Sequence, residues 1–182
     1  MEEDLTRYQE KLDNLLYSDS SDIFANYSQS HARRIIRTFF SAAQNTIVCL
    51  SGDFGKGVYS ECEIAAELRE AVRRGVRVAV ISLGTSDESR ENLRKLDKEL
   101  NKIAEQTKRG GSFKYRLGVV RDPNAEVQHY LIVDSKRYRL ESPHKTPVDE
   151  CVHAEVCCNG MAKAAVLARD FSAVWSRLNA SR

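Results

Sequence analysis

The stretch that decides the fold class is AVRRGVRVAVI, residues 71–81. Its first half ends an amphipathic helical pattern that begins near Glu61, and Gly75 stands where the C-cap glycine of a helix belongs. Its second half, Arg77 to Ile81, is apolar enough for a strand inside a parallel sheet, and residues 46–50 form a similar strand pattern before the helix. A strand, a helix and a second strand in this order need a crossover connection, so these residues predict an α/β fold.

The elements on either side of this unit follow from the same periodicities. Helical patterns cover residues 2–17, 29–43, about 86–108 and the C-terminal segment after Asn159-Gly160, and strand patterns cover residues 113–119, 127–134, 137–141 and 152–158. The expected order is α-α-β-α-β-α-β-β-β-β-α, which predicts a mixed β-sheet, parallel in its first part, flanked by helices on both faces. We expect residues 1–24 to form an N-terminal helical extension and residues 25–182 to form one domain.

A loop with three glycines, SGDFGKG at residues 51–57, follows the first strand of the unit. Its spacing matches neither the GxGxxG nor the GxxxxGK[ST] pattern. We therefore expect an ordinary turn, and a phosphate-binding loop is the alternative.

Composition narrows the functional classes. The chain has 182 residues, with 28 Lys+Arg against 26 Asp+Glu and a formal charge of +2. This near-balance argues against nucleic-acid binding by bulk charge but permits a local basic patch. Hydrophobic residues make up 42%, which fits a folded protein and not a disordered one. No apolar run is long enough to span a bilayer, and the first residues are acidic where a signal peptide is basic, so we expect a cytoplasmic protein without membrane insertion.

The five cysteines are an odd number, which fits reduced thiols in the cytoplasm. Cys151, His153, Cys157 and Cys158 are close in sequence and could suggest a metal site. However, they form no CxxC pair, and neighbours on a strand point to opposite faces. We therefore expect buried or half-buried thiols, and neither a metal site nor a cofactor.

Two stretches of the chain resemble the phospholipase D superfamily. The first is residues 47–82, in which a strand, a loop and a helix lead through Arg-Gly-Val into a second strand. The second is QHYLIVD at residues 128–134 with its following hairpin, then Ala154-Glu155-Val156 and a helix that ends in FSAVW at residues 171–175. The resemblance covers about residues 25–178 and implies a phospholipase D-like fold.

The family's signature, His-x-Lys-x4-Asp with Gly-Ser and Asn downstream, is degenerate in this chain. If Asp134 takes the Asp position, the His and Lys positions fall on Val127 and His129. The downstream positions then fall on Glu141, Ser142 and His144.

A second register makes His129 the family's catalytic histidine. Leu131 then replaces the Lys and Lys136 replaces the Asp. Neither register restores the motif, so the resemblance implies a scaffold that has lost its catalytic set.

The candidate site residues come from this resemblance and from strand alternation. His129 is the candidate nucleophile, although it is the only polar member of its strand face and such a histidine is commonly a core residue. If the family's fold is kept, His129, Ser142, His144 and Glu155 converge at one end of the sheet. Arg137 and Arg139 share a face and either meet a phosphate or pair with carboxylates such as Glu141 or Glu155. The candidate phosphate-binding or ligand-binding residues are therefore Asp134, Arg137, Arg139, Ser142, His144 and Glu155.

Three functions remain open from the sequence. The first is a non-catalytic binding or accessory module for a phosphate ester or nucleic acid, acting as a homodimer. One chain of this length has room for one half-site, and the family's single-motif members resemble half-sites completed across a two-fold axis. The second is an active, metal-independent phosphodiesterase or nuclease that uses His129 from two subunits. The third is a protein-interaction role in which the first helix docks through Leu5, Leu12 and Leu16.

Overall fold

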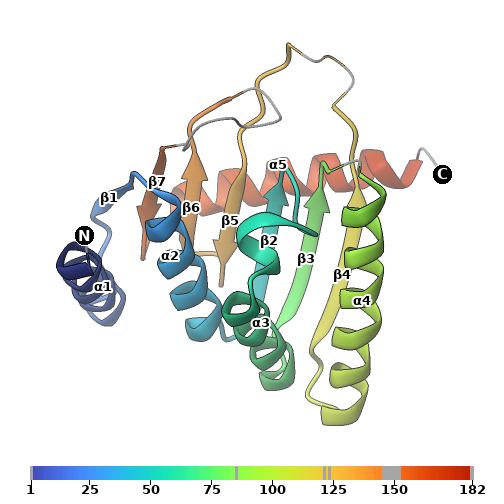
Figure 1. The fold of residues 1–182 in the computed structure, drawn as a ribbon, viewed down its shortest axis with the longest axis horizontal. Coiled ribbons are helices and arrows are strands. Elements are labelled where there is room, and N and C mark those ends of the chain that lie inside the picture. Colours follow the sequence, from blue (N-terminus) through green and yellow to red (C-terminus); the bar gives the residue numbers. More distant parts are fainter. Residues whose placement is uncertain (1, 85, 121, 123, 145–152, 181–182) are drawn as a thin grey trace.

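The computed structural model describes residues 2–84, 86–120, 122, 124–144 and 153–180 (Figure 1). In chain order the elements are α1 (Glu2–Tyr17), β1 (Ile23–Asn26), α2 (Gln29–Ala42), β2 (Thr46–Ser51), the 3₁₀ helix η1 (Gly57–Ser60), α3 (Cys62–Arg74), β3 (Arg77–Ser82), α4 (Asp87–Thr107), β4 (Ser112–Leu117), β5 (Tyr130–Val133), β6 (Arg137–Glu141), β7 (Ala154–Cys157) and α5 (Met161–Ala180).

The described strands form one seven-stranded mixed sheet in the order β1-β7-β6-β5-β2-β3-β4. β2, β3 and β4 are parallel, while β5, β6 and β7 pair antiparallel, which confirms the predicted α/β class and mixed sheet. The edge strand β1 was not expected from the sequence. It has only four residues, and its apolar Ile23 is exposed. It therefore lacks the alternation of apolar buried and polar exposed residues by which a strand is predicted from sequence.

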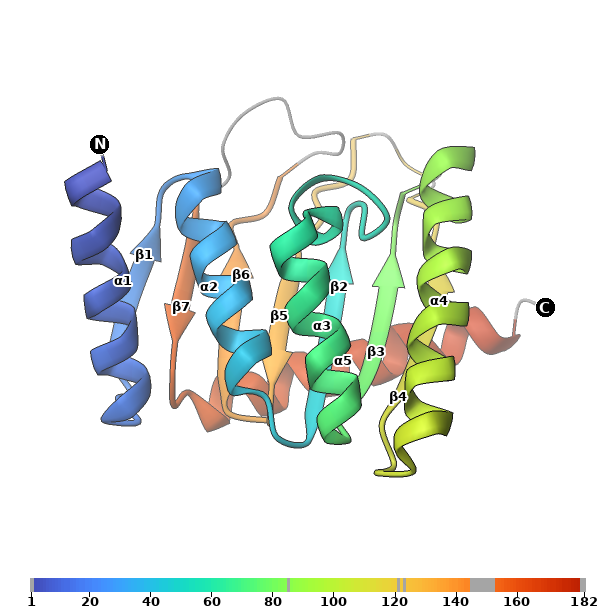
Figure 2. The same ribbon diagram turned by 60° about the horizontal axis from the view of Figure 1, so that its bottom comes forward.

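Helices cover both faces of the sheet, as predicted. Helices α1 to α4 lie side by side over one face, and α5 crosses the other (Figure 2). The core is divided accordingly. Leu131, Val133 and Val156 pack toward α2, α3 and α4, whereas Tyr130, Ile132, Tyr138 and Leu140 pack toward α5. This alternation follows from the period of two along a strand, and it decides which side chains can meet at the site.

The glycine-containing loop after β2 packs against α4, as expected for a structural turn. Phe54 is fully buried, and the Asp53 carboxylate accepts hydrogen bonds from the Ser89 hydroxyl and the Gly55 amide. A Cβ added to Gly55 would overlap the backbone carbonyl of Ser89. Close approach of the loop to α4 therefore explains this glycine without a phosphate ligand.

Helix α1 packs onto the main body of the fold through its apolar stripe. Leu12 is fully buried in the same core as α2 and α3, and Tyr8 stacks on His31 with ring centroids 3.8 Å apart. Leu5 and Leu16 are half-buried beside it. The apolar stripe that could have docked a partner therefore packs largely against the chain's own core. The domain division after residue 24 stays a prediction, and β1 runs across it.

Two further expectations concern the cysteines and the membrane. Cys49, Cys157 and Cys158 are buried free thiols and Cys62 is an exposed one, whereas Cys151 lies outside the described residues. Cys157 and Cys158 belong to the two different cores, as strand alternation predicts. Among the described residues, no helix has the length and apolarity to cross a bilayer.

Candidate functional site

The β5–β6 hairpin places His129 directly across from Glu141. The register pairs Tyr130 with Leu140, and the Glu141 amide donates to the His129 carbonyl at 2.9 Å. Asp134 and Ser135 turn the chain with φ angles of 54° and 58°, a left-handed conformation that suits tight hairpins. Because directly opposed residues share a face, His129 and Glu141 point to the same side of the sheet.

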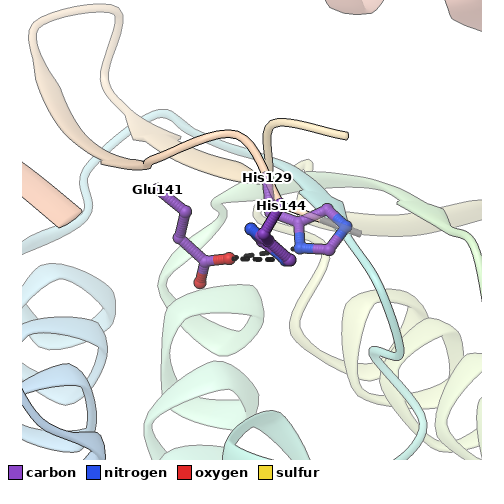
Figure 3. A group of neighbouring side chains, drawn as sticks. All are labelled: His129, Glu141 and His144. Atoms are coloured by element: carbon purple, nitrogen blue, oxygen red, sulfur yellow. Dashed lines mark hydrogen bonds and ion pairs between the residues drawn. The ribbon is translucent and has the colours of Figure 1, made fainter. Parts of the chain in front are cut away.

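Glu141 is the centre of a polar cluster at this end of the sheet (Figure 3). Its Oε2 atom lies 3.1 Å from Nδ1 of His129 and 3.7 Å from Nε2 of His144. Its Oε1 atom accepts a hydrogen bond from Nη1 of Arg139 at 2.5 Å. The imidazole centroids of His129 and His144 are 4.6 Å apart in an edge-to-face arrangement. One carboxylate therefore links two imidazoles and a guanidinium.

The cluster is largely shielded from water. Side-chain exposure is 8% for His129, 13% for His144 and 17% for Glu141. Burial alone would raise the pKa of Glu141, but the hydrogen bond with His129 and the charge and hydrogen bond of Arg139 outweigh it and lower the pKa to about 2. Glu141 is therefore an anion at any ordinary pH, and it balances the charge of Arg139.

Arg139 is fixed from both sides. Its Nε donates to Oδ1 of Asn26 on β1 at 3.0 Å, and its Nη1 donates to Glu141. A buried guanidinium with these partners is satisfied internally and is not presented to a phosphate. On β2, burial raises the pKa of the Cys49 thiol to about 12, and that thiol lies 3.5 Å from the Tyr59 hydroxyl.

Both imidazoles keep one buried nitrogen without a hydrogen-bond partner, Nε2 in each case. The other nitrogen of His144, Nδ1, is 2.9 Å from the carbonyl oxygen of Ser142, which makes Nδ1 the protonated atom in the neutral ring. His144 is held in place by a short bridge in which its backbone pairs with Val127. Ser142 itself is exposed, and its amide donates to the His153 carbonyl.

Asp134 and Arg137 lie at the other end of β5, away from His129. The Asp134 carboxylate accepts hydrogen bonds from the amides of Gln44, Asn45 and Thr46, which precede or begin β2. Arg137 donates to Asp134 at 3.0 Å. These two residues clamp the hairpin turn to β2 and do not join the cluster around Glu141. Both arginines singled out by the sequence thus pair with carboxylates.

The expectation that Glu155 converges on His129 is corrected by the register of β6 and β7. Glu155 pairs with Leu140, whereas Ala154 pairs with Glu141, so Glu155 points to the α5 face. There, burial and the Glu155 carboxylate raise the pKa of Tyr138 to about 12. One step along a strand moves a side chain to the opposite face, which is why this prediction failed.

Sequence reasoning missed Glu141 and Asn26 as members of the site. Glu141 was considered as the residue at one of the family's Gly-Ser positions and as a pairing partner for an arginine, but not as a site residue. The signal that could have identified it is the hairpin register, since a three-residue turn at residues 134–136 puts residue 141 opposite residue 129. Asn26 carries no local signal, because it meets Arg139 across 113 positions of sequence.

Comparisons with known proteins show the fold of this chain through solved structures, whereas its sequence matches no family model and no curated protein. Among solved structures, TrmBL2, an archaeal chromatin protein with a novel mode of DNA binding, superposes with a TM-score of 0.60 at 13% identity. That match covers 97% of this chain, which spans 63% of the TrmBL2 chain.

Two phospholipase D-type structures match over most of their own length. Nuc from Salmonella typhimurium, a phospholipase D family member, has a TM-score of 0.59 at 17% identity, with 85% of this chain and 94% of that chain covered. NucT from Helicobacter pylori has a TM-score of 0.58 at 15% identity, with the same coverage. This chain therefore has a phospholipase D-like fold, which confirms the resemblance found in the sequence.

Proposed function

We propose that this chain is a non-catalytic phospholipase D-like domain that binds nucleic acid, or a related phosphate ester, as a homodimer in the cytoplasm. The observation that carries the proposal is the occupation of the site by Glu141, whose carboxylate contacts His129, Arg139 and His144. A catalytic centre of this class would hold a phosphate among cationic and amide donors. Here an internal anion stands among those donors.

The candidate nucleophile is also poorly placed for attack. Nδ1 of His129 faces Glu141, and Nε2 is buried without a partner. A nucleophilic nitrogen must come within about 3–3.5 Å of phosphorus with its lone pair aligned. A substrate cannot reach a buried nitrogen in this way without displacing the residues over it. The position that the family gives to lysine is taken by His129 itself if Asp134 keeps the family's Asp position.

Nucleic acid is the preferred ligand because two kinds of observation favour it. The fold is shared with TrmBL2, a chromatin protein that binds DNA. The half-buried His144 also lies beside the exposed Ser142, and we propose that a phosphate approaches the cluster from this side. Because the net charge of +2 argues against binding by bulk charge, we expect a local contact with only a few phosphates.

Fluorescence anisotropy with labelled double-stranded DNA, single-stranded DNA and RNA at low salt tests this proposal. We expect binding whose affinity falls with salt by the shallow slope of a few phosphate contacts. We expect His144→Ala to weaken it, while His153→Ala, which removes an exposed histidine outside the cluster, does not. Failure to bind any of the three at low salt would overturn the ligand assignment. Sedimentation equilibrium tests the homodimer, and a monomer mass at micromolar concentration would contradict it.

The alternative function is a metal-independent phosphodiesterase that uses His129 from two subunits. One observation favours it: a carboxylate on Nδ1 can hold an imidazole with Nε2 free to attack, as in other carboxylate–histidine pairs. This function requires the burial of Nε2 to be relieved when substrate binds or subunits meet. It predicts cleavage that is lost in His129→Ala.

A further inference from the structure

We infer that His129, Glu141 and His144 form a binding site for one divalent transition-metal ion, with Zn²⁺ as the best-fitting probe. This site goes beyond the proposed function, because neither the fold nor phosphate binding requires a metal. It is also separate from the cysteine-containing segment considered from the sequence.

The three candidate ligand atoms are already gathered. One ring nitrogen of His129, one of His144 and a carboxylate oxygen of Glu141 all lie within 4.8 Å of one another. The two distances from Oε2 of Glu141 are 3.1 and 3.7 Å. Donors around a tetrahedral zinc ion are about 3.3 Å apart when each bond is about 2.0 Å. The side chains therefore need only small shifts to surround an ion.

The protonation pattern of His144 points the same way. Its Nδ1–H is directed at the Ser142 carbonyl, so the neutral ring turns the lone pair of Nε2 toward Glu141. That buried nitrogen has no hydrogen-bond partner. The lone pair of Nε2 and the Glu141 carboxylate oxygen are both acceptors and repel each other. A cation between them removes this repulsion. A backbone carbonyl on the far nitrogen is also the usual support of a metal-binding histidine.

Glu141 is oriented as a ligand would be. Arg139 holds Oε1, which leaves Oε2 directed at the two imidazoles. Two imidazoles and one carboxylate suit zinc and other first-row ions, and three protein ligands leave a coordination position open. The positive charges of Arg139 and of the divalent ion together exceed the single negative charge of Glu141. The occupied site therefore carries a net positive charge. An anion is therefore favoured in the open position, and only the assignment of that anion as a phosphate oxygen rests on the proposed function.

Metal binding can be measured directly on the full chain, purified without a histidine tag. Isothermal titration with Zn²⁺, and visible absorption with Co²⁺ as a spectroscopic substitute, should both show one ion per chain. We expect His144→Ala and Glu141→Gln each to weaken binding by about 100-fold or more, since the loss even of outer-shell partners costs about 10–100-fold. His153→Ala is the matched control and should bind like the wild type.

A second readout guards against a misfolded variant. Saturating Zn²⁺ should raise the unfolding midpoint of the wild type and of His153→Ala, but not that of His144→Ala, because an ion bound to the native state stabilises it. Absence of one-to-one binding by the wild type, or unchanged affinity in a folded His144→Ala variant, would overturn the inference.

The metal site and the proposed function can fail separately. DNA binding that persists in EDTA, together with no uptake of Zn²⁺, would remove the metal site and leave the function intact. One-to-one uptake of Zn²⁺ without binding of any nucleic acid would do the reverse.

Discussion

His129 and Glu141 face each other across the β5–β6 hairpin, with Nδ1 of the imidazole 3.1 Å from Oε2 of the carboxylate. The pairing follows from the hairpin register, which places an anion between the two imidazoles of the cluster. Arg139 completes the arrangement by binding the other carboxylate oxygen. The cluster is a built part of the core and not a chance surface contact, because its members are mostly shielded from water.

Removing the Glu141 carboxylate should lower the free energy of unfolding substantially. Glu141→Ala leaves the buried Arg139 guanidinium with Asn26 as its remaining side-chain partner. We expect a loss of about 3 kcal/mol in the free energy of unfolding, as for other buried pairs that lose one member. Urea denaturation measures it. Glu91→Ala is the control, since Glu91 forms only exposed pairs on α4, and its cost should stay below about 0.5 kcal/mol. Equal effects of the two substitutions would contradict this description of the cluster.

Asp134 should prove to be a structural residue. Its carboxylate accepts amide hydrogen bonds from three successive residues before and at the start of β2. Asp134→Ala should destabilise the fold by about 2–3 kcal/mol, and Asp134→Asn by less, because Asn keeps an acceptor oxygen and tolerates the positive φ. Thermal unfolding measures both. Asp122→Ala, at an exposed aspartate with one amide partner, should cost well under half as much.

The loop after β2 allows a sharp comparison of two glycines. Gly55→Ala places a methyl group against the backbone of Ser89 and should cost about 2 kcal/mol. Gly57 has open space around it and a φ of 63°, so Gly57→Ala should cost about 1 kcal/mol from backbone conformation alone. Neither variant, when folded, should change the affinity for nucleic acid. A selective loss of affinity in Gly57→Ala would instead support a phosphate-binding loop.

Thiol reactivity should separate the described cysteines. Cys62 is exposed and should react with a maleimide within seconds to minutes, whereas Cys49, Cys157 and Cys158 should be protected in the native state. Burial raises the pKa of Cys49 to about 12 and that of Cys158 to about 11, so little thiolate is present in the closed native state. Peptide mass spectrometry after timed labelling gives the rates. Cys62→Ser should remove the fast label from its peptide, and rapid labelling of Cys49 in the native protein would be inconsistent with the fold.

Much of the fold was accessible from sequence because it depends on local patterns. The helix that ends at Gly75, its flanking strands and the charged helix α4 all carry clear periodicity and caps, and Gly75 has the expected left-handed conformation. The edge strand β1 was missed because four residues with one exposed apolar side chain carry no distinct pattern. Its existence depends on pairing with β7, more than a hundred positions away.

The site was only partly accessible for the same reason. Strand alternation correctly put Arg137 and Arg139 on one face, but it could not say that Asn26 would meet Arg139. His129, Glu141 and His144 all fall on family positions, but the contact of Glu141 with His129 depends on a hairpin register that the turn residues decide. Glu155 was misassigned because its face depends on the alignment of β7 with β6. Pairing between distant segments, which local periodicity does not encode, explains each of these errors.

The most direct test of the central claim, that the cluster around Glu141 is non-catalytic, is a prolonged cleavage assay. End-labelled single-stranded and double-stranded DNA, RNA and a chromogenic phosphodiester are incubated with wild type and His129→Ala, with EDTA and with added Zn²⁺. Our account predicts intact substrate at background rates for both proteins under every condition. Turnover by the wild type that disappears in a folded His129→Ala variant would contradict it.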